Sequence, residues 1–304
     1  MQVVIDAVDR KRPITMEALI IDEGAEGLPI VEYRHSGVAN EDALPTLLCF
    51  AGGGASGAMF ARLAEECASR GIRLVSFDMP GHTPEKLLQA ATPPRSLISG
   101  ANSAARLAAS KTMISRWLPK STRLQVLSHS AGVVDIARII PAHGADIARF
   151  VITGAGIPGL AAMLTAVKGA AADKSIQRLS VPSIITTRQI PTGDLTLAYG
   201  AESDRVISDA TLRRYESTEH IGVPLALLRA RTVERQDWRG RTVVLIGSRG
   251  DVISPPARLR DAEKRLRARG ATVRTEILPW NLPHAFLAFG AAAQRVAEIA
   301  GQPS

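Results

Sequence analysis

The strongest local pattern in the chain is Leu124-Gln-Val-Leu-Ser-His-Ser130-Ala-Gly-Val-Val134. Four residues typical of a buried strand, Leu124–Leu127, lead into Ser-His-Ser-Ala-Gly, and an apolar stretch with helical spacing follows. This is the nucleophile-elbow pattern G-x-S-x-G, with Ser128 in place of the first glycine. Small residues must flank Ser130 because the tight turn strains its backbone and brings its neighbours against the adjacent strand and helix. The pattern predicts a serine hydroxyl held between a strand and a helix N-terminus.

A serine hydroxyl is a weak nucleophile near neutral pH, so it needs a base, and the base needs an orienting acid. The expected strand Val243–Ile246 is followed by Gly-Ser-Arg-Gly-Asp251, and the expected strand Val273–Leu278 is followed by Pro-Trp-Asn-Leu-Pro-His284. Both residues therefore come directly after strands. We expect Ser130 to act as the nucleophile, His284 as the general base and Asp251 as the acid that orients the imidazole.

Short β-branched strands alternate with amphipathic helices along the rest of the chain. This alternation predicts an α/β fold with a mostly parallel sheet that helices cover on both faces. Met16–Ile21 and Ile30–His35 are interpreted as an opening antiparallel hairpin. The other expected strands are Thr46–Phe50, Ile72–Phe77, Leu124–Leu127, Phe150–Thr153, Val243–Ile246 and Val273–Leu278. The expected helices are Ala58–Arg70, Ala104–Trp117, Val133–Ile140 (ended by Pro141), Ala257–Arg269 and His284–Ala300.

One long interval breaks this alternation. Residues 154–242 separate two expected strands, where a single helix would suffice. Apolar residues that include Met163 recur there at helical spacing. We therefore interpret residues 157–222 as a helical cap inserted over the carboxyl edge of the sheet, and residues 1–156 with 223–304 as the core domain. The alternative, a disordered linker, does not account for the apolar periodicity.

Residues 45–155 and 240–300 resemble the α/β-hydrolase superfamily. The chain order Ser130, Asp251, His284 is the order of that family's catalytic triad. In addition, Leu48-Cys-Phe-Ala-Gly-Gly-Gly-Ala-Ser56 is similar to its oxyanion loop, and Ser76-Phe-Asp-Met-Pro-Gly-His82 is similar to its D-x-P-G-H segment. Two departures bear on loop geometry, since many members carry histidine at position 51 and glycine at position 128.

The resemblance extends to the residues around the triad. It implies an oxyanion hole made by the backbone N–H of Gly53, together with the N–H of Ala131 at the helix N-terminus. Gly54, His82 and Met163 are the candidate residues of the substrate pocket, although a structural role for His82 and a plain core role for Met163 are the alternatives. The side chain of His129 is expected to pack in the core and to point away from the site. Asp78 is expected to tie down its own loop.

Composition excludes several other classes of protein. The net charge is +8, but the basic residues are scattered and only 4% of residues are aromatic, so we expect no nucleic acid partner. No stretch approaches the ~18 apolar residues of a membrane helix, and the first residues lack a signal-peptide core, so a cytoplasmic location is expected. Cys49 and Cys67 are expected to be free, buried thiols. No motif for a metal, a nucleotide or a flavin is found, so no cofactor is expected.

The chemistry expected from these residues is hydrolysis of a carboxylic ester, a thioester or a lactone through an acyl-enzyme on Ser130. The segments CFAGGGASGAMFARLAEE and HAFL are also similar to stand-alone type II thioesterases. That similarity implies an acyl carrier protein or coenzyme A thioester as an alternative substrate, which a basic surface would suit. A lyase or an acyltransferase that uses the same triad is a further alternative. A non-catalytic binding protein ranks last, because no triad residue is missing.

Overall fold

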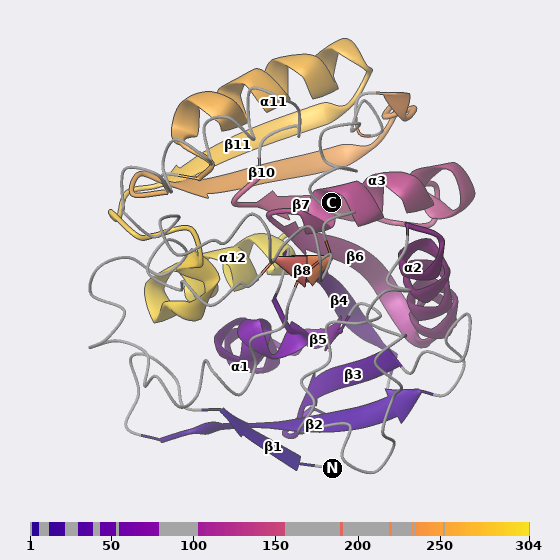
Figure 1. The fold of residues 1–304 in the computed structure, drawn as a ribbon, viewed down its shortest axis with the longest axis vertical. Helices are drawn as coiled ribbons and strands as arrows, with labels where there is room; N and C mark the ends of the chain where they lie inside the picture. Colours follow the sequence, from indigo (N-terminus) through magenta and orange to yellow (C-terminus); the bar gives the residue numbers. More distant parts are fainter. Residues whose placement is uncertain are drawn as a thin grey trace.

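One mixed sheet forms the centre of the protein. The computed structural model describes residues 2–5, 12–21, 30–38, 43–52, 55–78, 103–155, 189–190, 219–220, 233, 235–251 and 253–303. The sheet has nine strands in the order β1-β2-β3-β5-β4-β6-β7-β10-β11 (Figure 1). Its strands are β1 (Gln2–Ile5), β2 (Ile14–Ile21), β3 (Ile30–His35), β4 (Leu44–Phe50), β5 (Arg73–Phe77), β6 (Ser121–His129), β7 (Arg149–Thr153), β10 (Thr242–Ser248) and β11 (Thr272–Leu278).

Neighbouring strands in the part of the sheet with the order β5-β4-β6-β7-β10-β11 pair in parallel. The strands β1, β2 and β3 pair antiparallel with their neighbours. Every residue of β5 and β7 is buried, as is typical of parallel strands covered on both faces. In the pairing of β4 with β6, Phe50 lies opposite Ser128. This register brings the carboxyl ends of these two central strands to the same side of the sheet, the side at which its parallel strands end.

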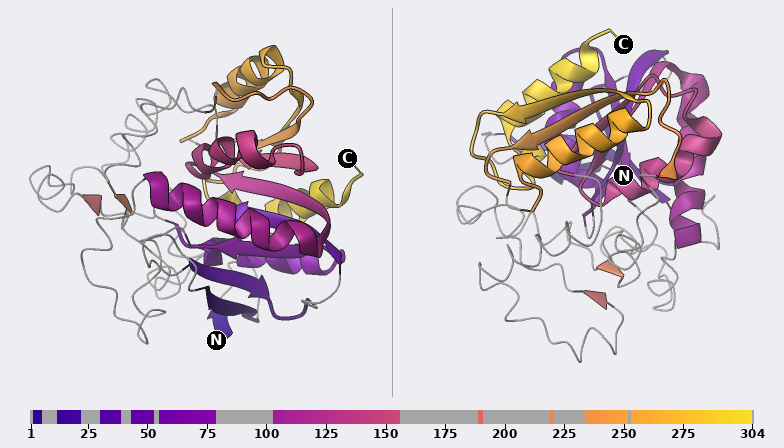
Figure 2. Two further views of the ribbon diagram at one scale, coloured as in Figure 1. Left: turned by 90° about the vertical axis from the view of Figure 1, so that its right-hand side faces the viewer. Right: turned by 90° about the horizontal axis from the view of Figure 1, so that it is seen from above.

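Helices cover both faces of the sheet (Figure 2). The buried core on one face contains residues of α1 (Ala61–Ala68) and α12 (Gly290–Gly301). The core on the other face contains residues of α2 (Ser103–Trp117), α3 (Gly132–His143) and α11 (Pro256–Ala268). Short 3-10 helices are η2 (Gly57–Phe60), η5 (Leu118–Lys120) and η7 (Phe286–Ala288). The parallel sheet between two helical layers confirms the expected fold class, and the opening hairpin is confirmed by the pairing of β2 with β3.

The helix expected over His284–Ala300 begins later than predicted. His284 lies in a turn, η7 follows it, and α12 starts only at Gly290. Phe289 between them has an extended backbone (φ −100°, ψ 131°), so it separates the two helical segments. Phe286 and Leu287 are fully buried, and this irregular stretch allows both to enter the core. The apolar spacing of this segment therefore reflects burial rather than one continuous helix.

Two further elements differ from the prediction. Pro141 does not end its helix, because α3 continues to His143. Proline removes one N–H, but so close to the helix end this costs a single bond, and the N–H of Gly144 still donates to Ile140 O at 2.8 Å. Strand β1 was not expected, and it adds an antiparallel edge strand to β2.

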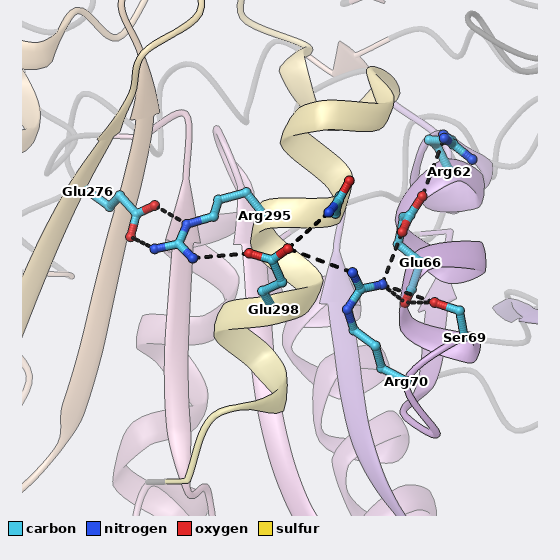
Figure 3. A network of polar contacts seen from close by, with 8 residues as sticks. Arg62, Glu66, Ser69, Arg70, Glu276, Arg295 and Glu298 are labelled. Atoms are coloured by element: carbon cyan, nitrogen blue, oxygen red, sulfur yellow. Dashed lines mark hydrogen bonds and ion pairs between the residues drawn. The ribbon is translucent and has the colours of Figure 1, made fainter.

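A chain of ion pairs ties the C-terminal helix to its neighbours on the surface (Figure 3). Arg295 of α12 binds Glu276 of β11 at 3.0 Å and Glu298 at 3.1 Å. Glu298 lies 3.8 Å from Arg70, which also binds Glu66 of α1 at 3.0 Å. Exposed pairs of this kind contribute little individually, about 0–1 kcal/mol each. The network therefore fixes the relative placement of β11, α12 and α1 more than it stabilises the fold.

The remaining expectations about the chain concern its cap, its cysteines and membrane spans. The expected cap, residues 157–222, lies outside the described residues except for β8 (Gln189–Ile190) and β9 (Glu219–His220), which pair antiparallel. Cys49 and Cys67 are buried and free, as expected, and burial raises the pKa of Cys67 to about 12. Within the described residues, no helix has the length and apolar character to cross a bilayer.

Candidate active site

Ser130 occupies the turn between β6 and α3. Its φ is +50°, and it is the only described residue other than glycine with a positive φ. A left-handed backbone is costly for a residue with a side chain, and it turns the chain sharply out of the strand. The N–H of Ser130 donates to Thr153 O at 2.9 Å, which anchors this turn on β7. Ala131 follows at the N-terminus of α3, where backbone N–H groups have no partner within the helix.

Glycines allow the neighbouring strand to approach this turn closely. A Cβ on Gly132 would lie 2.7 Å from Phe50 O and 2.8 Å from Ala51 O, so a side chain there would collide with the end of β4. A Cβ on Gly52 would lie 3.1 Å from the Cβ of Ser130. The segment after β4 therefore passes directly beside the serine. This contact explains the small residue two positions after Ser130, as the sequence predicts.

His284 and Asp251 are joined by hydrogen bonds. Nδ1 of His284 lies 3.0 Å from Oδ1 and 2.9 Å from Oδ2 of Asp251. The carboxylate is 1% exposed and the imidazole 6%, so both groups are shielded from water. Oδ1 also accepts the N–H of Ile253 at 3.0 Å and of Ser254 at 2.8 Å. These bonds fix the carboxylate in the loop that follows β10.

The charge on Asp251 favours one tautomer of His284. Burial raises the pKa of this carboxyl, but the positive charge of His284 and the hydrogen bonds from His284 and Ser254 outweigh it, so the pKa is lowered overall. Asp251 is therefore ionised near neutral pH and can only accept a proton in its hydrogen bonds. It holds the proton of His284 on Nδ1, which leaves Nε2 free to accept another.

Ser248 fastens the aspartate loop to the histidine loop. Its hydroxyl lies 3.0 Å from Trp280 O and 2.6 Å from Leu282 O, and it accepts the N–H of Leu282 at 3.0 Å. A Cβ on Gly250 would lie 2.7 Å from Leu282 O, so the two loops touch through their backbones. This role of Ser248 was not predicted from the sequence, although the residue stands in the Gly-Ser-Arg-Gly turn between strand and acid.

The His129 ring packs as expected in the core, but it does not point away from the site. It is 2% exposed, and its ring centroid lies 4.9 Å from that of His284. Ser130 is the next residue in the chain, so the ring of its neighbour, rather than the serine itself, makes the contact with His284. The described residues include no hydrogen bond from the Ser130 hydroxyl to His284. Of the three predicted catalytic side chains, His284 and Asp251 are thus in direct contact, and Ser130 is linked to them through its neighbour His129.

Asp78 binds another segment than the predicted one; its own loop, from residue 79 on, lies outside the described residues, so that prediction stays untested. It is fully buried and accepts hydrogen bonds from Tyr33 Oη, Ser56 Oγ and the N–H of Gly57, each at 2.7 Å. These bonds hold the segment that leads from β4 into η2. The remaining predicted site residues lie outside the described residues and stay predictions: Gly53, Gly54, His82 and Met163. Among the described residues, no group of three or more His, Cys, Asp or Glu side chains could hold a metal ion.

Comparison with known proteins shows the fold. No protein-family model matches the chain, and no curated protein matches its sequence. Many solved structures do match. A soluble variant of monoglyceride lipase from Saccharomyces cerevisiae is 13% identical, with a TM-score of 0.64 and coverage of 98% of this chain and 99% of that one. A carboxyl esterase from Bacillus coagulans is 12% identical, with a TM-score of 0.62 and coverage of 94% and 96%.

A thioesterase domain from the curacin biosynthetic pathway is also similar, at 14% identity, a TM-score of 0.53 and coverage of 94% of this chain and 99% of that one. A hydrolase-fold protein from Chitinophaga pinensis matches as well, at 14% identity and a TM-score of 0.58, over 93% of this chain and 97% of its own. The similarity spans almost the whole length of each of these proteins. The chain therefore has the α/β-hydrolase fold, as its sequence motifs predict.

Proposed function

We propose that this protein is a serine hydrolase that cleaves a carboxylic ester, a thioester or a lactone. The observation that carries the proposal is the His284–Asp251 hydrogen bond, formed beside a serine in the left-handed turn between β6 and α3. An ionised carboxylate, an imidazole with a free nitrogen and a hydroxyl at a helix N-terminus are the parts that acyl transfer requires. The esterase, lipase and thioesterase structures with the same fold support this class of reaction.

The reaction would proceed in two halves. Nε2 of His284 takes the proton of the Ser130 hydroxyl as Oγ attacks the acyl carbonyl carbon, and the carbonyl oxygen gains the negative charge. The N–H groups of Ala131 and Gly53 would stabilise this oxyanion. His284 then gives its proton to the leaving group, which departs and leaves an acyl group on Oγ. Water, deprotonated by Nε2 of His284, attacks the acyl carbon; the bond to Oγ then breaks, the acid leaves, and His284 returns the proton to Oγ, which restores the serine hydroxyl.

The hydrogen bond from the Ser130 hydroxyl to Nε2 of His284 is part of this proposal. In enzymes without substrate such bonds are often long, and they tighten in the substrate complex. Gly54, His82 and Met163 are proposed to line the substrate pocket, and residues 157–222 are proposed to form the cap above it.

Thioester hydrolysis is the second candidate within this class. It is favoured by the similarity to the curacin thioesterase domain and by the net charge of +8, which would attract an acidic acyl carrier protein or coenzyme A. Simple esters and lactones need no such charge. Salt dependence separates the two, because attraction to an acidic carrier weakens as ionic strength rises, whereas hydrolysis of a neutral aryl ester does not.

A fluorophosphonate probe tests the proposal directly. The wild-type protein should be labelled, and Ser130→Ala should not be. Hydrolysis of aryl esters, acyl-coenzyme A and lactones should fall by about 10⁶-fold in Ser130→Ala, and by about 10⁴-fold in Asp251→Asn, which holds the wrong tautomer of His284. Labelling without hydrolysis of any of the three substrates would favour a lyase or an acyltransferase. A wild-type protein that is never labelled would refute the proposal.

A further inference from the structure

We propose that His129 is a positioning residue, whose neutral imidazole holds the ring of His284 in the orientation that catalysis needs. The inference rests on the proposed function, because it assigns a role relative to His284 as the general base. Three observations support this role: the packing of three rings, the hydrogen bond that fixes His129, and the glycine that makes room for the His129 ring.

The ring of His129 contacts the rings of both His284 and Phe286. The His129 centroid lies 4.9 Å from the His284 centroid, with 42° between the ring planes. His129 also contacts Phe286, with centroids 5.9 Å apart and an interplanar angle of 84°. His129 and Phe286 are both almost completely buried. The hydrogen bonds to Asp251 fix one atom of the His284 ring, and the contact with His129 restricts its remaining tilt.

Gly154 leaves the space that the two imidazoles occupy. Its φ is +57°, and a Cβ there would lie 2.7 Å from Cε1 of His129 and 3.2 Å from Cε1 of His284. Its N–H donates to Ile246 O at 3.0 Å, so the backbone of this residue is held against β10. The chain directly after β7 therefore touches both rings, and neither can shift toward it.

A hydrogen bond from β7 fixes His129 itself. The hydroxyl of Thr153 donates to Ser128 O at 3.0 Å, so its proton is already used. Nδ1 of His129 lies 3.2 Å from the same hydroxyl oxygen and must therefore be the donor. This places the proton of His129 on Nδ1. Burial, and secondarily the charge of His284, lowers the pKa of His129 to about 3, with Asp251 opposing this shift. The charged groups that face His129 are thus His284 and Asp251.

A neutral ring at this place suits a base that becomes charged. When His284 takes the proton of Ser130, a second positive charge nearby would oppose the step, and burial keeps His129 from supplying one. The ring also excludes water from one side of the imidazole. A base held in position by packing avoids the loss that a small misplacement causes, which is about 100-fold for a shift of ~1 Å.

The experiment compares variants that separate the ring from the hydrogen bond. His129→Asn keeps an N–H donor for Thr153 but has no ring, whereas His129→Phe keeps a ring and has no donor. Leu266→Ala is the matched control, because Leu266 is 1% exposed in the core of α11 and its truncation leaves a cavity without altering the imidazoles. For each variant kcat, KM and the rate of fluorophosphonate labelling are measured well below its unfolding temperature.

The proposal predicts that His129→Asn lowers kcat and the labelling rate by about 100-fold, with KM nearly unchanged. His129→Phe should recover most of that loss, and Leu266→Ala should keep wild-type kcat. The proposal is overturned if His129→Asn, once shown to be folded, has the kcat of Leu266→Ala. If His129→Phe does not fold, the comparison of His129→Asn with Leu266→Ala still decides. Failure of the proposed function is recognised separately, because Ser130→Ala would then retain full hydrolysis.

Discussion

Acid should destabilise this protein through His129 more than through an ordinary histidine. The ring is buried, and its pKa is lowered from 6.5 to about 3. The unfolded chain therefore binds a proton as the pH falls below about 6.5, whereas the folded protein does not until about pH 3. Protonation favours the unfolded state throughout this window, so stability falls as the pH falls.

The size of the effect follows from the two pKa values. Between pH 8 and pH 5, proton binding by the unfolded state alone lowers the free energy of unfolding. The pH falls about 1.5 units below the unfolded pKa, which corresponds to about 2 kcal/mol. Urea unfolding at the two pH values measures this loss, and His129→Asn provides the reference because it does not titrate. His284 and Asp251, which face His129, are present in both proteins, so the difference between the proteins reports position 129.

We expect the wild-type protein to lose about 2 kcal/mol more than His129→Asn between pH 8 and pH 5. Equal losses in the two proteins would show that His129 is protonated in the folded state. The account of this ring as a buried neutral group would then be wrong, and the assignment of its proton to Nδ1 alone would fail with it.

Three further predictions concern the surroundings of the site. Ser130→Gly should be more stable than Ser130→Ala by about 1 kcal/mol in urea unfolding, because glycine relieves the left-handed strain; equal stabilities would argue against strain at this turn. Ser128→Ala should match or exceed wild-type stability by up to about 1 kcal/mol, since the buried hydroxyl Oγ of Ser128 has no hydrogen-bond partner in the described part of the chain, and a clear loss would reveal a partner. Asp135→Ala should cost roughly 3–5 kcal/mol, because it leaves the buried guanidinium of Arg106, now 2.6 Å from Asp135, without its carboxylate; thermal unfolding that matches the wild-type protein would contradict this.

The parts of the fold that the sequence predicts are those encoded locally. Each parallel strand contains a short apolar run, and β5 and β7 are buried along their full lengths, so the pattern marks them clearly. The elbow is recognised from a short motif, although the requirement for glycine at position 132 comes from non-local contacts with Phe50 and Ala51 that the register of β4 and β6 imposes. The contact between His284 and Asp251 followed from placing both after neighbouring parallel strands.

The errors arise where distant packing overrides local spacing. The apolar residues after His284 have helical spacing, yet Phe286 and Leu287 enter the core from η7 and a break at Phe289. Proline usually ends a helix, but Pro141 lies in the last turn of α3, where it removes a single hydrogen bond. Local sequence rules predict the conformation that a segment prefers. Where two conformations have similar free energies, the burial of large side chains decides between them.

The direction of the His129 side chain relative to the site could not be predicted from the sequence, because it depends on the face of the sheet that a distant segment covers. Side chains alternate along a strand, so position 129 shares a face with Leu127, which belongs to the same buried cluster as Phe286. The alternation is readable from the sequence, but the face on which the segment after His284 returns is not. Once α12 packs beside α1, that segment and His129 must meet on one face. The residue before a nucleophile can thus contact the base, and whether it does depends on the side of the sheet to which the final helix returns.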